Sequence, residues 1–145
     1  MSLLLHKASK EDLKAVTFIQ NSRFAQKWKE EEFQKILTIR GFLLLVAEEE
    51  KKDLGFILIF RSGTEAEIYL LGVRKEEEGK GIGRMLLSGG EKEVKKEGAE
   101  EMLLDVRKGN RRALDLYTRN GYVQYHVRKG YYENGEDALL LRKAL

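Results

Sequence analysis

One segment of the chain passes from an apolar strand pattern through three closely spaced glycines into an amphipathic helix pattern. The strand pattern covers residues 68–73, the glycines are Gly79, Gly81 and Gly83, and the helical pattern continues to Glu97. Glycines at alternate positions let several backbone N–H groups point to one side without obstruction by side chains. The first turn of a helix adds unpaired N–H donors and the positive end of the helix dipole. The segment therefore predicts a strand–turn–helix unit that binds phosphate groups.

The spacing of these glycines fits neither common nucleotide-binding pattern. The dinucleotide pattern needs a glycine three residues after Gly81, where Arg84 stands, and the chain has no Gly-Lys-Ser/Thr run of the P-loop kind. A tight strand-to-helix connection without a ligand is the alternative interpretation at this point.

Length and composition restrict the class of protein. A chain of 145 residues is long enough for one core, so we expect one domain over residues 1–145. It has no apolar run of eighteen residues and too short an apolar start for a signal peptide, so we expect neither a membrane span nor export. The absence of cysteine excludes disulfides and fits a cytoplasmic protein. The two histidines, His6 and His126, have no companion at metal-ligand spacing, so we expect no metal site.

The charge pattern gives weak support to nucleic-acid binding. The net charge is +3, but Lys and Arg alternate with Glu through most of the chain and form no long basic stripe. The local excess at residues 107–112 faces either an anionic ligand or solvent. Charged residues make up 35% of the chain, mostly Lys and Glu, a composition typical of hyperthermophile proteins.

Hydrophobic periodicity and capping signals predict an α/β fold, with a mixed sheet covered by helices on both faces. We expect strands over residues 2–7, 42–47, 55–60, 65–73, 101–107, 122–127 and 138–142. We expect helices after the capping box at residues 9–12 (apolar positions Leu13, Val16, Phe18 and Ile19), over residues 30–39 (Phe33, Ile36 and Leu37), from the glycine turn to Glu97, and from Asn110 to Asn120. Residues 21–28 are predicted to form a loop between the first two helices.

Two residues close to the glycine unit are candidates for chemistry. Asp105 lies mid-strand, where aspartate is unfavourable, and an ion pair with Arg107 is the simpler interpretation. Tyr117 lies two turns into the helix capped by Asn110, where core packing is the simpler interpretation. A phosphate-binding turn, a carboxylate and a tyrosine together suit transfer of a group from a phosphate-bearing carrier to a nucleophile.

From residue 68 to 145 the chain resembles the GNAT acetyltransferases, and within them the protein N-terminal branch of ribosomal-protein alanine acetyltransferases (RimI) and their archaeal relatives. The matching stretches are residues 72–73, 79–83, 104–107, 110, 113–117, 121–122 and 130–138. The ending Tyr-Tyr-Glu-Asn-Gly-Glu-Asp-Ala is the part most specific to this branch. Before residue 42, Trp28 and Phe33 echo a Pro-Trp…Phe pattern, with Lys27 in place of the proline.

The resemblance implies the GNAT fold and acetyl-CoA as the acetyl donor. In this family the pantetheine arm lies between two splayed strands, and the pyrophosphate takes the N–H groups of the glycine turn. Carried over to this chain, the cofactor-binding residues are Leu71, Gly72, Val73, Gly79, Lys80, Gly81, Gly83, Arg84 and Asn110. Glu78 stands where the family usually has Arg or Gln, and Lys80, Arg84 and Arg112 could offset its charge.

The resemblance also implies catalytic roles. Asp105 matches the general base, which is glutamate in the ribosomal-protein enzymes, so the shorter side chain would act through a bridging water. Tyr117 matches the general acid. The residues expected to flank the substrate are Phe24, Trp28, Tyr131 and Tyr132, with plain packing as the alternative for each.

The implied activity is acetylation of the α-amine of a protein N-terminus, of a ribosomal protein or a wider set, without nucleic acid, membrane or metal. Two alternatives stay open at this point. The first is acetylation of a small amine such as a polyamine or an antibiotic, and the second is a CoA-binding regulatory module without activity.

Overall fold

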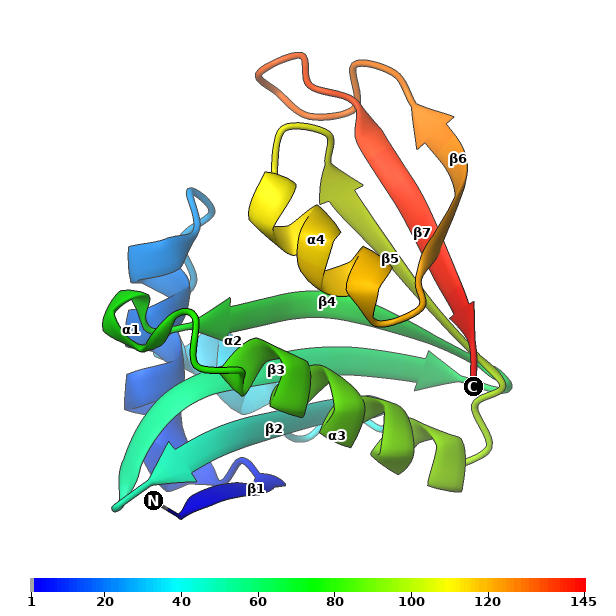
Figure 1. The fold of residues 1–145 in the computed structure, drawn as a ribbon. Coiled ribbons are helices and arrows are strands. Elements are labelled where there is room, and N and C mark those ends of the chain that lie inside the picture. Colours follow the sequence, from blue (N-terminus) through cyan, green and yellow to red (C-terminus); the bar gives the residue numbers. More distant parts are fainter. Residues whose placement is uncertain (1) are drawn as a thin grey trace.

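The computed structural model describes residues 2–145, in which seven strands form one sheet (Figure 1). The strands are β1 (Leu3–Lys7), β2 (Phe42–Glu49), β3 (Lys52–Ser62), β4 (Glu65–Val73), β5 (Glu101–Arg107), β6 (Val123–Arg128) and β7 (Ala138–Ala144). Their order in the sheet is β1-β2-β3-β4-β5-β7-β6. Only β4 and β5 are parallel, and all other neighbours are antiparallel.

Helices cover both faces of this sheet, as Figure 1 shows. They are α1 (Leu13–Arg23), α2 (Glu30–Ile36), α3 (Ile82–Lys96) and α4 (Arg111–Arg119), with short 3-10 turns η1 (Lys10–Asp12) and η2 (Lys75–Glu77). One apolar core lies between the sheet and α1–α2, and the other lies between the sheet and α3–α4. The mixed α/β architecture predicted from the sequence is therefore confirmed. None of the helices in residues 2–145 is long and apolar enough to cross a membrane.

The first two helices differ from the prediction in detail. Helix α1 continues to Arg23, into the segment expected to be a loop. Helix α2 ends at Ile36, because the N–H groups of Thr38 and Ile39 bond carbonyls three residues earlier instead of four. Phe18 was expected in the core but is exposed, because it lies beside the buried stripe and its ring packs under the Arg74 guanidinium. Gln20 takes the buried place instead, and its amide donates to the Gln26 carbonyl at 3.1 Å.

The parallel pair β4–β5 is joined only at its beginning. The paired residues are Glu65 with Glu101, Ala66 with Met102, and Glu67 with Leu103. Beyond these pairs the two strands diverge, as the ribbon in Figure 1 shows. The carboxyl ends of parallel strands are where α/β proteins bind ligands. Here that end leads through η2 and the glycine turn into α3.

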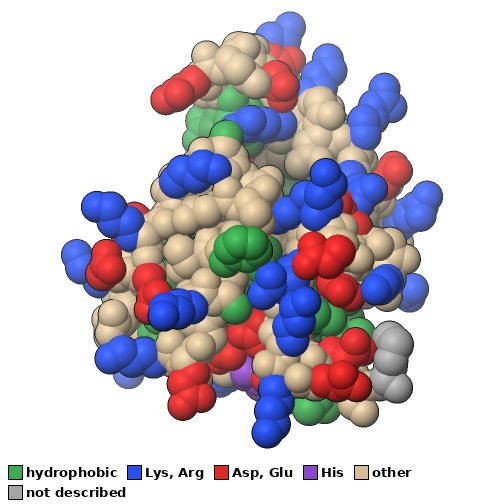
Figure 2. Space-filling view, turned by 90° about the vertical axis from the view of Figure 1, so that its left-hand side faces the viewer, with side chains coloured by type: hydrophobic (Ala, Val, Ile, Leu, Met, Phe, Trp, Pro, Cys, Tyr) green, Lys and Arg blue, Asp and Glu red, His purple; other side chains and the backbone are tan. Residues whose placement is uncertain are grey.

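Charges of both signs mix over the face drawn in Figure 2. Lys and Arg side chains are scattered there among Asp and Glu, and no extended patch of a single sign develops on that face.

The turn between β2 and β3 contains a stabilising substitution that can be tested. Glu50 and Lys51 both have positive φ, 50° and 66°, as in a type I′ turn. Side chains with a Cβ are strained there, whereas Asn-Gly adopts this turn readily. We expect Glu50→Asn/Lys51→Gly to raise the free energy of unfolding by about 1 kcal/mol. A urea titration measures it, and an unchanged or lower midpoint would contradict the strain.

Candidate active site

The glycine turn exposes its backbone to an open space. Gly79 and Gly81 have φ of 80° and 82°, the left-handed region that favours glycine, and a Cβ built on either meets no atom within 4 Å. Gly81 is the N-cap of α3. Gly83 differs, because a Cβ there would touch Leu116 of α4 at 3.5 Å. The first two glycines therefore leave room above the turn, and the third lets α4 pack close to α3.

The N–H groups of this turn are available as donors. Glu78 donates its N–H to the Lys75 carbonyl and Met85 donates to the Gly81 carbonyl, at 3.3 and 3.1 Å. Between them, the N–H groups of residues 79–84 make no hydrogen bond to any group in residues 2–145. Unpaired donors at the start of a fifteen-residue helix form an anion-binding site.

The Glu78 carboxylate, at the start of the glycine turn, is neutralised by two arginines. Its carboxylate pairs with Arg23 at 3.0 Å and also with Arg112. The sequence suggested Arg112 for this role but missed Arg23, which lies at the end of α1, 55 residues away in the chain. Lys80, also suggested, instead pairs with Glu77 at 3.1 Å. The negative charge of Glu78 is therefore balanced, and it does not prevent an anion from binding at the turn.

The end of β4 is covered by the end of α1. A Cβ on Gly72 would lie 2.9 Å from the Phe56 ring, 3.2 Å from the Phe24 ring and 3.3 Å from Ile19. Gly72 thus allows Phe24 to lie directly on β4, beside Leu71 and Val73, which are half-buried. This contact places Phe24 next to the opening between β4 and β5.

Tyr117 lies in the core between α4 and the sheet. Its ring meets Tyr122 edge-on at 5.5 Å, and burial raises the pKa of its hydroxyl, which stays protonated at neutral pH. The Tyr122 hydroxyl donates to Glu91 at 2.8 Å, whereas none of the described residues hydrogen-bonds the Tyr117 hydroxyl. The Tyr117 hydroxyl is therefore protonated and remains available to donate a hydrogen bond or a proton to a ligand.

Asp105 lies on the opposite face of β5 from the buried Leu104 and Val106, and it is exposed. Within residues 2–145 it forms no ion pair with Arg107, whose guanidinium instead lies 4.6 Å from the centre of the Tyr132 ring. The structure adds Glu67 of β4 to this group. Burial, and then the Asp105 carboxylate, raise the pKa of Glu67 above its usual value. Two carboxylates thus lie where β4 and β5 begin to separate.

Comparison with known proteins identifies the fold and the family. The sequence model of the acetyltransferase (GNAT) family matches residues 12–122. The chain belongs to the GNAT acetyltransferase family. The GNAT fold and acetyltransferase class predicted from the sequence are confirmed.

The similar proteins include two kinds of N-terminal acetyltransferase. The [ribosomal protein bS18]-alanine N-acetyltransferase of Escherichia coli (strain K12) is 28% identical over 133 residues, 90% of this chain and 89% of that protein. An N-alpha-acetyltransferase of Saccharolobus solfataricus is 37% identical over 82 residues, 56% of this chain and 49% of that protein. The crystal structure of the ribosomal-protein-S18-alanine N-acetyltransferase from Escherichia coli superposes with a TM-score of 0.89 at 25% identity, covering 99% of this chain and 94% of that one.

The remaining aromatic candidates of this GNAT protein divide into two groups. Burial, followed by the charge of Asp105, raises the pKa of the Tyr132 hydroxyl. Tyr131 packs edge-on against Tyr132 at 5.2 Å and is half exposed. Trp28 stacks on Phe33 at 4.6 Å and packs against the core under α1 and α2.

Asn110 and Arg84 lie at the ends of the two helices that border the site. The Asn110 side chain caps α4 by accepting the Ala113 N–H at 3.2 Å, so its amide NH2 stays available. Arg84 is exposed on the first turn of α3. Sequence reasoning missed Glu67 and Arg23, and only Glu67 left a signal, as a second carboxylate in the strand that leads to the glycine turn.

Proposed function

We propose that this GNAT acetyltransferase transfers the acetyl group of acetyl-CoA to the α-amine of a protein N-terminus. The observation that carries the proposal is the row of unpaired N–H groups at residues 79–84, placed at the end where β4 and β5 separate. The two N-terminal acetyltransferases among the similar proteins support an α-amine as the acceptor, of a ribosomal protein or of a wider set of proteins.

The residues present fit acetyl-CoA as the donor. The open space over Gly79 and Gly81 accepts phosphate groups, and a Cβ at either position would intrude on it. The exposed Arg84 of α3 can pair with a phosphate, and the Asn110 amide NH2, at the start of α4, can donate a hydrogen bond to the cofactor. Among residues 2–145, no strand pairs with β4 on the β5 side beyond Glu67, so main-chain groups of Leu71, Gly72 and Val73 are the candidates for pairing with the pantetheine arm.

The chain's own groups supply an acid and a base. An ammonium ion must lose a proton before it can attack a thioester, and an α-amine with a pKa of about 8 loses it far more easily than a lysine at about 10.4. The Asp105 and Glu67 carboxylates would accept this proton, Asp105 through a bridging water because its side chain is short. Tyr117 would donate its hydroxyl proton to the departing CoA thiolate. The Val73 N–H would polarise the thioester carbonyl by donating a hydrogen bond to its oxygen. Phe24, Tyr131 and Tyr132 would flank the peptide.

A turnover assay tests this function. Release of CoA is measured with acetyl-CoA and a panel of peptides that differ in their first two residues. We expect release with free N-termini and none with the same peptides acetylated beforehand. Tight binding of acetyl-CoA without turnover would favour a regulatory CoA-binding module, and turnover only with polyamines or antibiotics would favour a small-amine acetyltransferase.

A valine at Gly81 should weaken acetyl-CoA binding. The added side chain fills the space above the turn, and the loss of charge-assisted hydrogen bonds worth about 1.5–3 kcal/mol raises Kd about 10- to 100-fold. Gly63→Val is the matched control, because Gly63 also has positive φ (64°) and open space around it but lies in the β3–β4 turn. Isothermal titration calorimetry measures both. Equal affinities of the two variants would contradict phosphate binding at this turn.

A further inference from the structure

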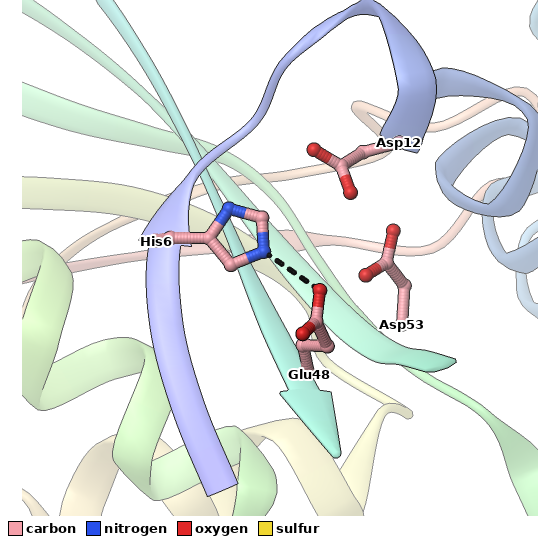
Figure 3. A group of neighbouring side chains, drawn as sticks. All are labelled: His6, Asp12, Glu48 and Asp53. Carbon is pink, nitrogen blue, oxygen red and sulfur yellow. Dashed lines mark hydrogen bonds and ion pairs between the residues drawn. The ribbon is translucent and has the colours of Figure 1, made fainter. Parts of the chain in front are cut away.

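Four side chains from four separate elements converge on the side of the sheet near the N-terminus, outside the proposed active site (Figure 3). They are His6 of β1, Asp12 of η1, Glu48 of β2 and Asp53 of β3, and one ligand atom of each lies within 4.8 Å of those of the others. Two donor atoms on opposite sides of a first-row metal ion at about 2.1 Å lie about 4.2 Å apart. Small side-chain movements would therefore bring all four into coordination.

The Asp53 carboxylate needs a partner that the described residues do not supply. Asp53 is only 7% exposed and points into the cluster in Figure 3. Within residues 2–145 its carboxylate forms no ion pair and receives no N–H or hydroxyl hydrogen bond, and its hydrogen-bonding neighbour is the Asp12 carboxyl, which can pair with it only by sharing a proton. The neighbouring Arg74 donates its Nε–H to the Asp53 main-chain carbonyl at 2.7 Å and forms no ion pair with the Asp53 carboxylate. A buried carboxylate without a compensating charge or donor is costly.

The neighbours of Asp53 increase this cost. Glu48 lies directly opposite Asp53 in the β2–β3 ladder, where two like charges destabilise a sheet. Three carboxylates face a single imidazole, so the cluster must hold either extra protons or a cation.

His6 is oriented as a metal ligand would be. Its Nδ1 lies 2.9 Å from the Lys7 main-chain carbonyl, which can only accept, so Nδ1 carries the proton. Nε2 lies 3.2 Å from the Glu48 carboxylate, which also only accepts, so a metal ion bound at Nε2 would displace the proton that His6 shares with Glu48. Histidines that bind metals usually donate their other ring N–H to a carbonyl or carboxylate in this way.

Asp12 is fixed in the same manner. Its Oδ2 accepts the Ser9 N–H at 2.8 Å and the Ser9 hydroxyl at 3.2 Å, which leaves Oδ1 for a ligand. Hydrogen-bonded carboxylates of this kind surround metal ions. His6 is partly exposed, which provides a route from solvent.

We propose that His6, Asp12, Glu48 and Asp53 bind one divalent first-row metal ion. One nitrogen and three carboxylate oxygens suit Zn²⁺ or Mn²⁺ better than Mg²⁺, which prefers oxygen ligands alone. The ion would link the edge strand β1, the start of α1 and the β2–β3 hairpin. Its role is structural, because the cluster is separate from the glycine turn and from Asp105.

Thermal unfolding of the chelator-treated protein, without a histidine tag, tests the site with Zn²⁺, Mn²⁺ and Mg²⁺ as probes. At one hundred times Kd, Zn²⁺ or Mn²⁺ should raise Tm by about 5–10 °C, with a smaller effect of Mg²⁺. Calorimetry should find one ion per chain, and X-ray absorption of the Zn²⁺ form should show one imidazole among oxygen ligands. No rise in Tm and no binding would overturn the proposal in favour of a proton shared by the carboxylates.

Two variants and a control locate the ion. Asp53→Asn removes the repulsion, so without metal it should be at least as stable as the parent protein, but it should lose the response to Zn²⁺. Glu48→Gln should lower Zn²⁺ affinity at least tenfold and serves if the first variant does not fold. Glu97→Gln, an exposed residue at the end of α3, should bind as the parent does. Full Zn²⁺ binding by both Asp53→Asn and Glu48→Gln would overturn the assignment.

Discussion

Replacing both Glu67 and Asp105 by their amides is expected to lower kcat/KM for an N-terminal peptide about 10²- to 10⁴-fold at pH 7. The amides keep the shape of the side chains but cannot accept the proton of the substrate ammonium, and general-base catalysis contributes a factor of this size. The deficit should shrink near pH 9, where an α-amine with a pKa of about 8 is already neutral. Steady-state release of CoA between pH 6 and 9 measures both effects.

The single variants separate the two carboxylates. The Asp105 charge contributes to raising the Glu67 pKa, so Asp105→Asn should let Glu67 ionise at lower pH and retain part of the activity. Glu97→Gln is the control, since Glu97 is an exposed carboxylate at the end of α3, away from this group. A loss that is equal at all pH values would indicate structural damage instead of a missing base.

Removing the Tyr117 hydroxyl should reduce kcat by about 10²-fold or more while leaving acetyl-CoA affinity and stability almost unchanged. Tyr117→Phe keeps the ring that packs edge-on against Tyr122, and none of the described residues loses a hydrogen bond. The unfolding free energy should therefore stay within about 0.5 kcal/mol of the parent value. Unchanged turnover would rule out Tyr117 as the acid.

Tyr122→Phe is the matched control for this experiment. Its hydroxyl donates to Glu91, so the change should cost about 1 kcal/mol of stability and leave kcat unaltered. Opposite patterns in two tyrosines that touch each other would distinguish a chemical role from a packing role. A loss of kcat in Tyr122→Phe, with unchanged kcat in Tyr117→Phe, would make Tyr122 the acid and Tyr117 the packing residue.

The sequence indicated the fold well because its signals are local. The strands show as apolar runs, Asn110 and Gly121 mark the ends of α4, and the three glycines mark the start of α3. The end of α2 was less predictable, since a turn of 3-10 hydrogen bonds beyond Ile36 continues the same apolar pattern. Phe18 was misplaced because periodicity alone does not show that an arginine will cover its ring.

Partners that are distant in the chain were the part that sequence reasoning missed. Arg23 reaches Glu78 only because α1 ends beside the glycine turn, and Glu67 meets Asp105 only because β4 and β5 start as neighbours. The prediction of no metal site rested on sequence spacing alone, and the residues that we propose as companions of His6 come from three other elements that no motif spacing connects.

The short seam between β4 and β5 has a mechanical consequence. In the sheet, the portion with β5, β6, β7 and α4 is joined to the other strands by three residue pairs. Glu91 of α3 adds a hydrogen bond from Tyr122 and an ion pair with Lys143. A ligand bound between the ends of β4 and β5 would hydrogen-bond to both strands, as a further strand would, and would hold the two portions together. Amide hydrogens at the ends of β4 and β5, beyond Glu67 and Leu103, should then exchange more slowly when acetyl-CoA is bound, whereas those of β2 and β3, already paired with neighbours on both edges, should hardly respond.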